Sequence, residues 1–150
     1  MKKNLGAGIF MAALYLLLSM SAMAAEGAWA EGFGQGNLEY FIDKQGYQLY
    51  IGCPTEDGSS DSKASISLSK ISDGSEIKKF TITAAGVTYE APFTADSRVG
   101  DNNFISLLES LHKTNALVKF GNKSINFPKS NAAKVIPLFG AKTFSCNLSF

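Results

Sequence analysis

Residue types that commonly carry catalysis or bind metals are scarce in this chain of 150 residues. It has one histidine, His112, and two cysteines. Zinc sites in proteins take most of their ligands from these two residue types, and a disulfide would consume both thiols. The Gly-x-Ser-x-Gly turn that presents the nucleophile of many hydrolases is also absent. We therefore predict no bound metal, no cofactor and no serine-hydrolase chemistry.

A surplus of charge of one sign is also lacking. The chain has 14 basic and 13 acidic residues, and its longest basic run is only Lys78-Lys79. Nucleic acids and anionic membrane surfaces attract proteins that gather positive charge in one patch. Because the lysines are scattered, we expect neither of these as a partner.

The N-terminus has the layout of a bacterial secretory signal peptide. Lys2 and Lys3 precede an uncharged and mostly apolar run, and an Ala-x-Ala cleavage site ends that run. We predict that residues 1–24 are a signal peptide and that residues 25–150 remain as a single β-rich domain, periplasmic or secreted. The competing interpretation is an uncleaved anchor, because the uncharged run at 4–25 is about long enough to cross a bilayer.

The two cysteines, Cys53 and Cys146, are expected to form a disulfide, because thiols oxidise in the compartments that exported proteins reach. Cys53 shares an apolar face with Leu49 and Ile51, and Cys146 shares one with Leu148. Both thiols would therefore point into the core. The bond would tie an early hairpin to the end of the chain, and two buried free thiols are the alternative.

Alternation of apolar and polar residues predicts a mainly β fold. The pattern at 38–53 indicates a hairpin that turns at Asp43–Gly46 and pairs Ile42 with Tyr47. The glycine-rich segment 27–36 is either a flexible lead-in or an edge strand held by Trp29. Further strands are expected at 64–68, 77–83, 87–91, 116–120, 124–127 and 142–150.

One segment changes to the period of a helix, at about 102–113, after a cap at Asp101-Asn102. A short helical turn is expected near 131–136. We predict an antiparallel β-sandwich or partly closed barrel of about seven to nine strands with this single amphipathic helix. The strands are shorter than the 9–11 residues or so of a membrane-spanning strand, so we expect no insertion after cleavage and place the last residue, Phe150, in the core.

Four residues are candidates for partner binding. Phe41 and Tyr50 project from the second face of the hairpin, where they would form an exposed apolar patch unless another layer covers them. Asp57 and Asp61 lie in the acidic, Gly/Ser-rich loop at 55–62. Solvated loop charge is the alternative interpretation of these two carboxylates.

A hydrolase that uses carboxylates is the competing class of protein. It requires that at least two acid–base groups meet in one cleft. The candidates are Asp57, Asp61, Asp96, Asp101 and His112. The alternative is that the carboxylates are solvated and that His112 covers the border between the helix's apolar face and solvent.

The second half of the chain has the order of a helix (DNNFISLLESLHK), two strands (ALVKF and SINFP), a small-residue segment (KSNAAKVIP) and a late cysteine. In this order it resembles the invasion-associated locus B type of exported bacterial proteins. Members of that family look like secreted or periplasmic β-rich proteins without recognised catalysis. The resemblance implies an exported protein that is not an enzyme, and it assigns no functional residue.

These observations favour a small exported protein that is stapled by one disulfide and binds another protein or an envelope component. An inhibitor or immunity-type role against an exported enzyme belongs to this class. Two alternatives stay open: a small periplasmic hydrolase, and a carrier of a small ligand. The carrier predicts an apolar cavity larger than a packing defect.

Overall fold

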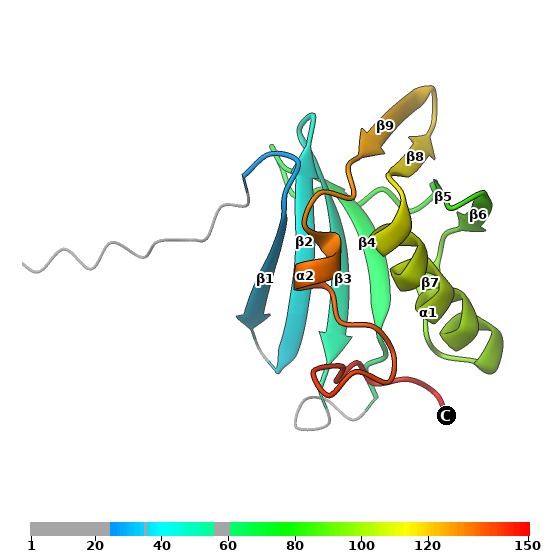
Figure 1. The fold of residues 1–150 in the computed structure, drawn as a ribbon. Helices are drawn as coiled ribbons and strands as arrows, with labels where there is room; N and C mark the ends of the chain where they lie inside the picture. The colour runs from blue at the N-terminus through cyan, green and yellow to red at the C-terminus, as the bar shows by residue number, and fades with distance from the viewer. Residues whose placement is uncertain (1–24, 35, 56–60) are drawn as a thin grey trace, which may run out of the picture.

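The computed structural model describes residues 25–34, 36–55 and 61–150. Within these ranges the chain forms nine strands and two helices, and the strands build two antiparallel sheets (Figure 1). This confirms the prediction of a mainly β fold with one long helix and a short helical turn. The predicted signal peptide at 1–24 and the loop residue Asp57 lie outside the described residues.

The first sheet has five strands in the order β1-β2-β3-β4-β7. Its members are β1 (Trp29–Gly34), β2 (Asn37–Lys44), β3 (Tyr47–Pro54), β4 (Ser65–Lys70) and β7 (Phe93–Thr94). The glycine-rich segment is therefore an edge strand rather than a flexible lead-in. Trp29 is buried in the core and holds the start of this strand.

The hairpin of β2 and β3 exists, but its register differs from the predicted one by two residues. Ile42 pairs with Leu49 rather than with Tyr47, and only Gln45 and Gly46 connect the strands. Both connecting residues have positive φ, 51° and 79°, as in the mirror-image turn whose twist suits a hairpin. Because the shift is even, every side chain stays on its predicted face.

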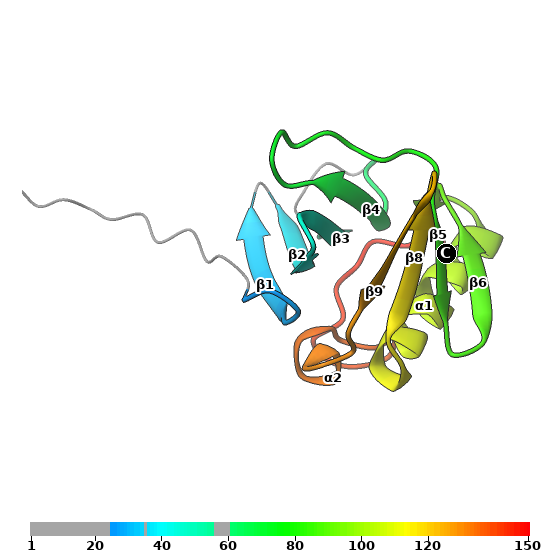
Figure 2. The ribbon, with the colours of Figure 1, turned by 90° about the horizontal axis from the view of Figure 1, so that it is seen from above.

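The second sheet has four strands in the order β6-β5-β8-β9 (Figure 2). Its members are β5 (Thr81–Ala84), β6 (Val87–Glu90), β8 (Ala116–Phe120) and β9 (Lys123–Phe127). Val118 pairs with Ile125 in the hairpin of β8 and β9. The connection is again a two-residue turn, here with Gly121 at a φ of 53°.

The long helix, α1 (Arg98–Lys113), begins earlier than predicted. Ser97 is its cap, and the Ser97 side chain accepts a hydrogen bond from the Gly100 N–H at 3.1 Å. Asp101 therefore lies in the first turn rather than at the cap. The short helix α2 (Ala132–Val135) confirms the predicted helical turn. The apolar face of α1 is buried as its spacing predicts and contains Phe104, Leu107, Leu108 and Leu111.

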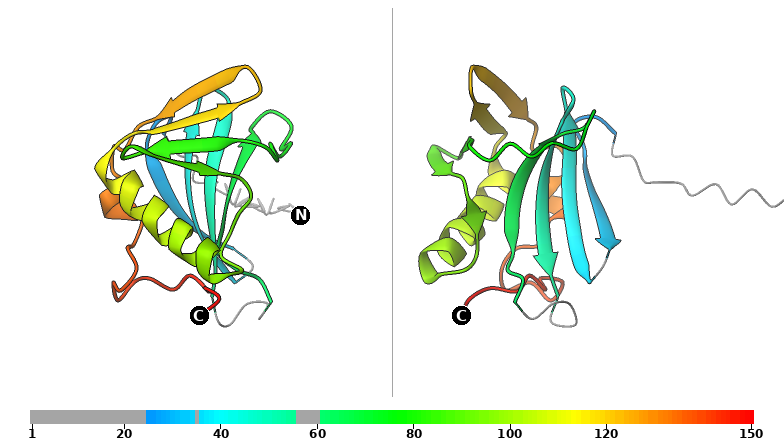
Figure 3. Two further views of the ribbon diagram at one scale, coloured as in Figure 1. Left: turned by 90° about the vertical axis from the view of Figure 1, so that its right-hand side faces the viewer. Right: turned by 180° about the vertical axis from the view of Figure 1, so that it is seen from behind.

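The core lies between the five-stranded sheet on one side and the four-stranded sheet with α1 on the other (Figures 2 and 3). Tyr47 and Phe120 connect the two sheets, with ring centroids 4.9 Å apart. No ladder of hydrogen bonds joins the sheets in the described ranges. The arrangement is therefore sandwich-like, with no closed barrel in the described ranges.

The predicted last strand, at 142–150, is not a strand. Among the described residues, its only hydrogen bonds to the backbone of a distant part of the chain are at Asn147, whose N–H donates to the Pro54 carbonyl and whose carbonyl accepts from the Ala64 N–H. The alternation still predicts burial, because Cys146 and Leu148 are buried. Phe150 is 69% exposed, so its placement in the core was wrong.

Candidate functional site

A disulfide joins Cys53 to Cys146, as the sequence predicts, with the two Cα atoms 4.3 Å apart. Cys53 lies at the end of β3 and Cys146 in the C-terminal segment, and both are buried. The bond spans 93 positions of the chain. It fastens the final residues against the core that separates the two sheets.

Polar contacts fix the same segment beyond the disulfide. The Asp101 carboxylate accepts hydrogen bonds from the Ser149 backbone N–H, at 3.0 Å, and from the Ser149 hydroxyl. The ammonium group of Lys63 donates to the Leu148 carbonyl at 3.2 Å. Asp101 is fully buried. Its carboxylate is stabilised by the two Ser149 donors and by its position in the first turn of α1. Its role is structural.

Phe41 and Tyr50, the predicted partner-binding pair, are direct cross-strand neighbours on the outer face of the five-stranded sheet. Both are partly buried rather than fully exposed. Seen from behind, this face of the sheet carries no helix or strand of the described ranges (Figure 3, right). The sheet therefore presents an aromatic pair to its surroundings, because the described second layer covers only the inner face.

Glycines explain how two aromatic rings lie partly buried on an open sheet. A Cβ placed on Gly52 would approach the Tyr50 ring to 3.0 Å, and a Cβ on Gly32 would approach the Phe41 ring to 3.5 Å. Each ring therefore leans over a neighbouring residue that has no side chain. The result is a low aromatic surface, which we call the outer platform and define by Phe41, Tyr50 and Glu39.

The outer platform is acidic. Glu39 and Asp43 share its face, and the outward positions of β2, β3 and β4 hold no lysine or arginine. Burial and the neighbouring Glu39 carboxylate raise the pKa of Tyr50, so its hydroxyl stays protonated and can donate a hydrogen bond. Serines complete the face along β4: Ser65, Ser67 and Ser69. Such a surface can stack on flat groups and bind neutral or basic polar ones.

The carboxylates and the histidine have separate surroundings. Asp61 and Asp96 are exposed on the surface, whereas Asp101 binds Ser149. The Nε2 atom of His112 donates to the Ile136 carbonyl at 2.8 Å, because a carbonyl can only accept. No group of three or more metal-ligating side chains exists in the described part of the chain.

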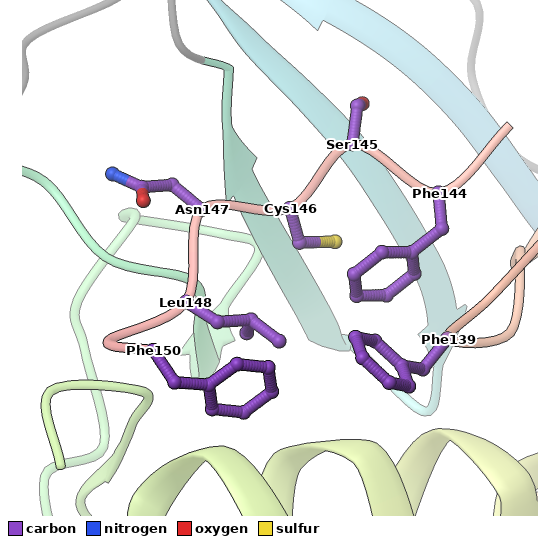
Figure 4. Close-up of a pocket in the computed structure, with 7 residues that line it drawn as sticks. All are labelled: Phe139, Phe144, Ser145, Cys146, Asn147, Leu148 and Phe150. Atoms are coloured by element: carbon purple, nitrogen blue, oxygen red, sulfur yellow. The ribbon is translucent and has the colours of Figure 1, made fainter. Parts of the chain in front are cut away.

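A pocket that contains both aromatic and polar groups lies in the C-terminal part of the chain, where the sequence pattern predicts only a strand. It has a volume of about 470 Å³ and is lined by Phe139 and by residues 144–148 and Phe150. The side chains of Phe139, Phe144, Leu148 and Phe150 point toward one another around it (Figure 4). The Phe139 ring stands edge-on to those of Phe144 and Phe150, with centroids 5.5 and 5.7 Å apart.

A signal for this pocket existed in the sequence. Three of the eleven phenylalanines fall within residues 139–150, which is more than one alternating strand needs for its core face. A strand at 142–150 predicts that Phe150 lies in the core, whereas Phe150 lines the pocket and is exposed; Phe144 is partly buried against the core. The segment instead bends back after Phe139, and the pocket forms where the two ends of this bend meet.

The fold and these surfaces define a small two-sheet β protein with one disulfide, an open acidic platform and a pocket lined by aromatic rings. The chain belongs to the YfjT family, whose model matches residues 27–136. The uncharacterized protein YfjT of Escherichia coli (strain K12) is 29% identical over 139 residues, which cover 85% of this chain and 90% of YfjT. The uncharacterized protein YkfB of the same strain is 26% identical over 142 residues, covering 87% and 92%.

These matches correct the resemblance to invasion-associated locus B proteins. That likeness covered only the second half of the chain, whereas the family match begins at residue 27 and contains the whole five-stranded sheet. A helix followed by two strands and a cysteine is a common order in β-rich domains, so it does not identify a family. No solved structure is significantly similar to the chain. In the ranges described, neither helix has the length and apolar character that crossing a bilayer requires.

Proposed function

We propose that this protein is exported to the periplasm or secreted, and that it binds another protein or envelope component there without catalysing a reaction. The outer platform carries this proposal. It is the open face of a sheet whose other face packs against the core. Phe41 and Tyr50 lie on this open face, each with its ring beside a glycine. Contiguous apolar surface that is not used for folding often marks a binding site.

Two features support export. Disulfides persist in oxidising compartments, and the Cys53–Cys146 bond is buried and joins distant segments. The chain also makes folded contacts close to the predicted cleavage site: the Gly27 N–H donates to the Asp43 carbonyl, and Glu26 lies 3.6 Å from Lys44. Intact-mass measurement of the protein from an osmotic-shock extract should give a chain that starts at residue 25 and lacks two thiol protons. A full-length chain with free thiols in the cytosol would contradict export.

The platform is tested by capture with matched variants. The oxidised mature chain, residues 25–150, is immobilised and exposed to envelope extract, in parallel with Phe41→Ala/Tyr50→Ala and with Val87→Ser. Val87 is 47% exposed on β6 of the other sheet, so its replacement controls for loss of apolar surface in general. We expect one stoichiometric partner on the parent and on the Val87 variant, and at least a tenfold loss on the platform variant. Equal capture by all three would overturn the proposal.

The absence of catalysis rests on the roles of the candidate groups. Asp101 and His112 each bind a fixed group of the protein, Ser149 and the Ile136 carbonyl, and these contacts lie on different parts of α1. A general acid or base must instead reach a substrate atom. Asp61→Asn and Asp96→Asn test the two exposed carboxylates in an assay for hydrolysis. Any hydrolytic activity that these two changes abolish would favour the enzyme class.

The C-terminal pocket supports a second candidate function, carriage of a small apolar ligand. Its volume of about 470 Å³ is in the range of small-molecule sites, and three aromatic rings line it. The neutral fluorescent probe N-phenyl-1-naphthylamine should bind once per chain, and Phe139→Ser should weaken this binding about tenfold. The exposed fraction of Phe139, 51%, is similar to the 47% of Val87, so Val87→Ser is the control. Binding that is unsaturable, or equal in both variants, would remove this candidate.

A further inference from the structure

The outer edge of β1 has backbone groups that no described residue satisfies. The Asn131 side chain accepts from the Trp29 N–H at 2.8 Å and donates to the Trp29 carbonyl at 2.9 Å. These two groups of Trp29 therefore point away from β2. Since successive residues of a strand alternate, the N–H and carbonyl groups of Glu31 and Phe33 point the same way. Neither residue makes a hydrogen bond on this side within the described ranges.

This edge is only lightly protected against pairing with another strand. Proteins block such edges with charged residues, especially lysine, with proline or with a covering element. In β1, whose sequence is WAEGFG, Glu31 is the one charged residue and the Asn131 side chain covers only Trp29. Phe33 is 69% exposed on the edge. β1 also forms the outer border of the sheet in Figures 1 and 2, with Asn131 as the side-chain cap at one end.

A pocket of about 640 Å³ adjoins the same edge on the inner face of the sheet. Glu31, Leu38 and Tyr40 form its wall on the sheet side, and the segment around α2 forms the opposite wall. Glu31 pairs with Tyr40, and Phe33 pairs with Leu38, so the pocket lies beside the free edge groups. A strand added to β1 would place alternate side chains over this pocket.

We propose that β1 is a self-association site, at which β1 of a second copy of this chain adds in antiparallel orientation. The two-fold axis passes through Gly32, so that Glu31 of each copy pairs with Phe33 of the other. Each of these pairs exchanges two main-chain hydrogen bonds. The two five-stranded sheets then form one continuous sheet. This inference goes beyond the proposed function and uses different residues.

Register and charge single out this arrangement. Centring on Glu31 would oppose two carboxylates and would require the Trp29 groups that Asn131 already binds. Centring on Phe33 would pair the two Phe33 residues with each other, so the Glu31 groups of each copy would no longer face Phe33 of the other. The Gly32 axis uses all the free groups of both copies and separates the two charges. It also sets the exposed Phe33 ring of each copy beside Glu31 and over the other copy's pocket, which is why the occupant is a second copy.

A cysteine cross-link tests the axis directly. Opposite residues of a non-hydrogen-bonded pair have Cα atoms about 4.5 Å apart, which a disulfide can span. Gly32→Cys should therefore give a covalent dimer under mild oxidation. Gly34→Cys is the matched control, because the two copies of residue 34 would lie about 14 Å apart along the strands. A Cβ has ordinary contact distances at both glycines, 3.4 Å at Gly32 and 3.6 Å at Gly34.

The readout is the fraction of dimer on a non-reducing gel, with peptide mass spectrometry to confirm a 32–32 link and an intact Cys53–Cys146 bond. We expect at least tenfold more dimer for Gly32→Cys than for Gly34→Cys. Equal cross-linking would indicate random collision and would overturn the proposal. So would the absence of dimer in both variants.

Sedimentation equilibrium of the unmodified chain gives an independent measurement. We expect a monomer–dimer equilibrium that Phe33→Ser weakens at least tenfold and that Val87→Ser leaves unchanged. A monomer at all concentrations up to the millimolar range would overturn the proposal. A dimer that Phe33→Ser does not weaken would place the interface elsewhere and would overturn it as well. Loss of dimerisation would leave platform-dependent capture intact, so failure here is distinguishable from failure of the proposed function.

Discussion

The β2–β3 hairpin and the C-terminal segment at 142–150 carry the same alternation of apolar and polar residues, yet they are held in different ways. All eight residues of β2 pair with β3 in an unbroken antiparallel register. In the C-terminal segment, among the described residues, only Asn147 bonds to the backbone of a distant part of the chain. Both nevertheless bury alternate side chains, including Leu49 in the hairpin and Leu148 in the segment.

The difference shows that alternation reports which side chains are buried and not whether a ladder forms. A ladder needs a neighbouring strand whose edge is free along its length. The C-terminal segment has none, and a few strong bonds replace the ladder: the disulfide at Cys146 and the contacts of Ser149 with Asp101. Stability is therefore distributed along the hairpin and concentrated at a few atoms in the segment.

Removing the disulfide should have the largest effect. The double change Cys53→Ser/Cys146→Ser avoids a leftover thiol and should lower the free energy of unfolding by about 4 kcal/mol, because the unfolded chain regains the freedom of a long loop. Urea denaturation measures this loss, and reduction of the parent protein should reproduce it. Carboxypeptidase should also begin to remove the last residues. A loss below about 1 kcal/mol would mean that the other contacts hold the segment.

Leu49→Ala tests the distributed side of the comparison. Leu49 is fully buried in the hairpin, and truncation of a buried leucine costs about 3 kcal/mol. Urea denaturation should show this loss, while resistance of the C-terminus to carboxypeptidase in the native state should stay unchanged. Release of the last residues in this variant would show that the hairpin and the segment are coupled more closely than their separate bonding indicates.

Asp101→Ala should destabilise the protein by about 2 kcal/mol, because it removes the charged acceptor of two hydrogen bonds that Ser149 donates. Asp101→Asn keeps one acceptor oxygen and should cost about half as much. Carboxypeptidase should remove Phe150 and Ser149 faster from both variants. If the alanine and asparagine variants lose equal stability, the helix position of the charge matters more than its contact with the segment.

Gln45→Asn should have the smallest effect and the opposite sign. Gln45 has a φ of 51° and precedes Gly46 in the hairpin turn. Asn-Gly is the preferred pair for a turn with two positive φ values, so the change should stabilise the protein by about 0.5 kcal/mol in urea denaturation. Gln48→Asn, in the strand beside the turn, is the control and should not stabilise. A destabilised Gln45→Asn variant would question the turn geometry.

Side-chain faces could be predicted from the sequence, whereas pairing could not. The period of two assigned Ile42, Leu49 and Cys53 to one face, and Phe41 and Tyr50 to the other, as the structure has them. The predicted register of the hairpin was wrong because Asp43 and Gly46 fit an ordinary four-residue turn. The positive φ of Gln45 could not be predicted, because glutamine does not favour that conformation. An even shift preserves the faces, so the error was invisible in the hydrophobic pattern.

Long-range contacts explain the other errors. Asp101 has the residue type of a helix cap, but Ser97 caps α1 and Asp101 binds Ser149, which lies 48 positions away. The outer platform was predicted through Phe41 and Tyr50. The glycine beside the Phe41 ring, Gly32, could not be predicted, because it comes there only when β1 pairs with β2. Contacts of this kind arise from the assembled fold and leave no local pattern.

The place of the disulfide along the chain has a consequence for biogenesis. A polypeptide is made from its N-terminus, so Cys53 exists as a lone thiol until Cys146, 93 positions further along the chain, is added. The bond can therefore form only after synthesis has reached Cys146, and a product truncated before Cys146 would keep Cys53 as a free, reactive thiol.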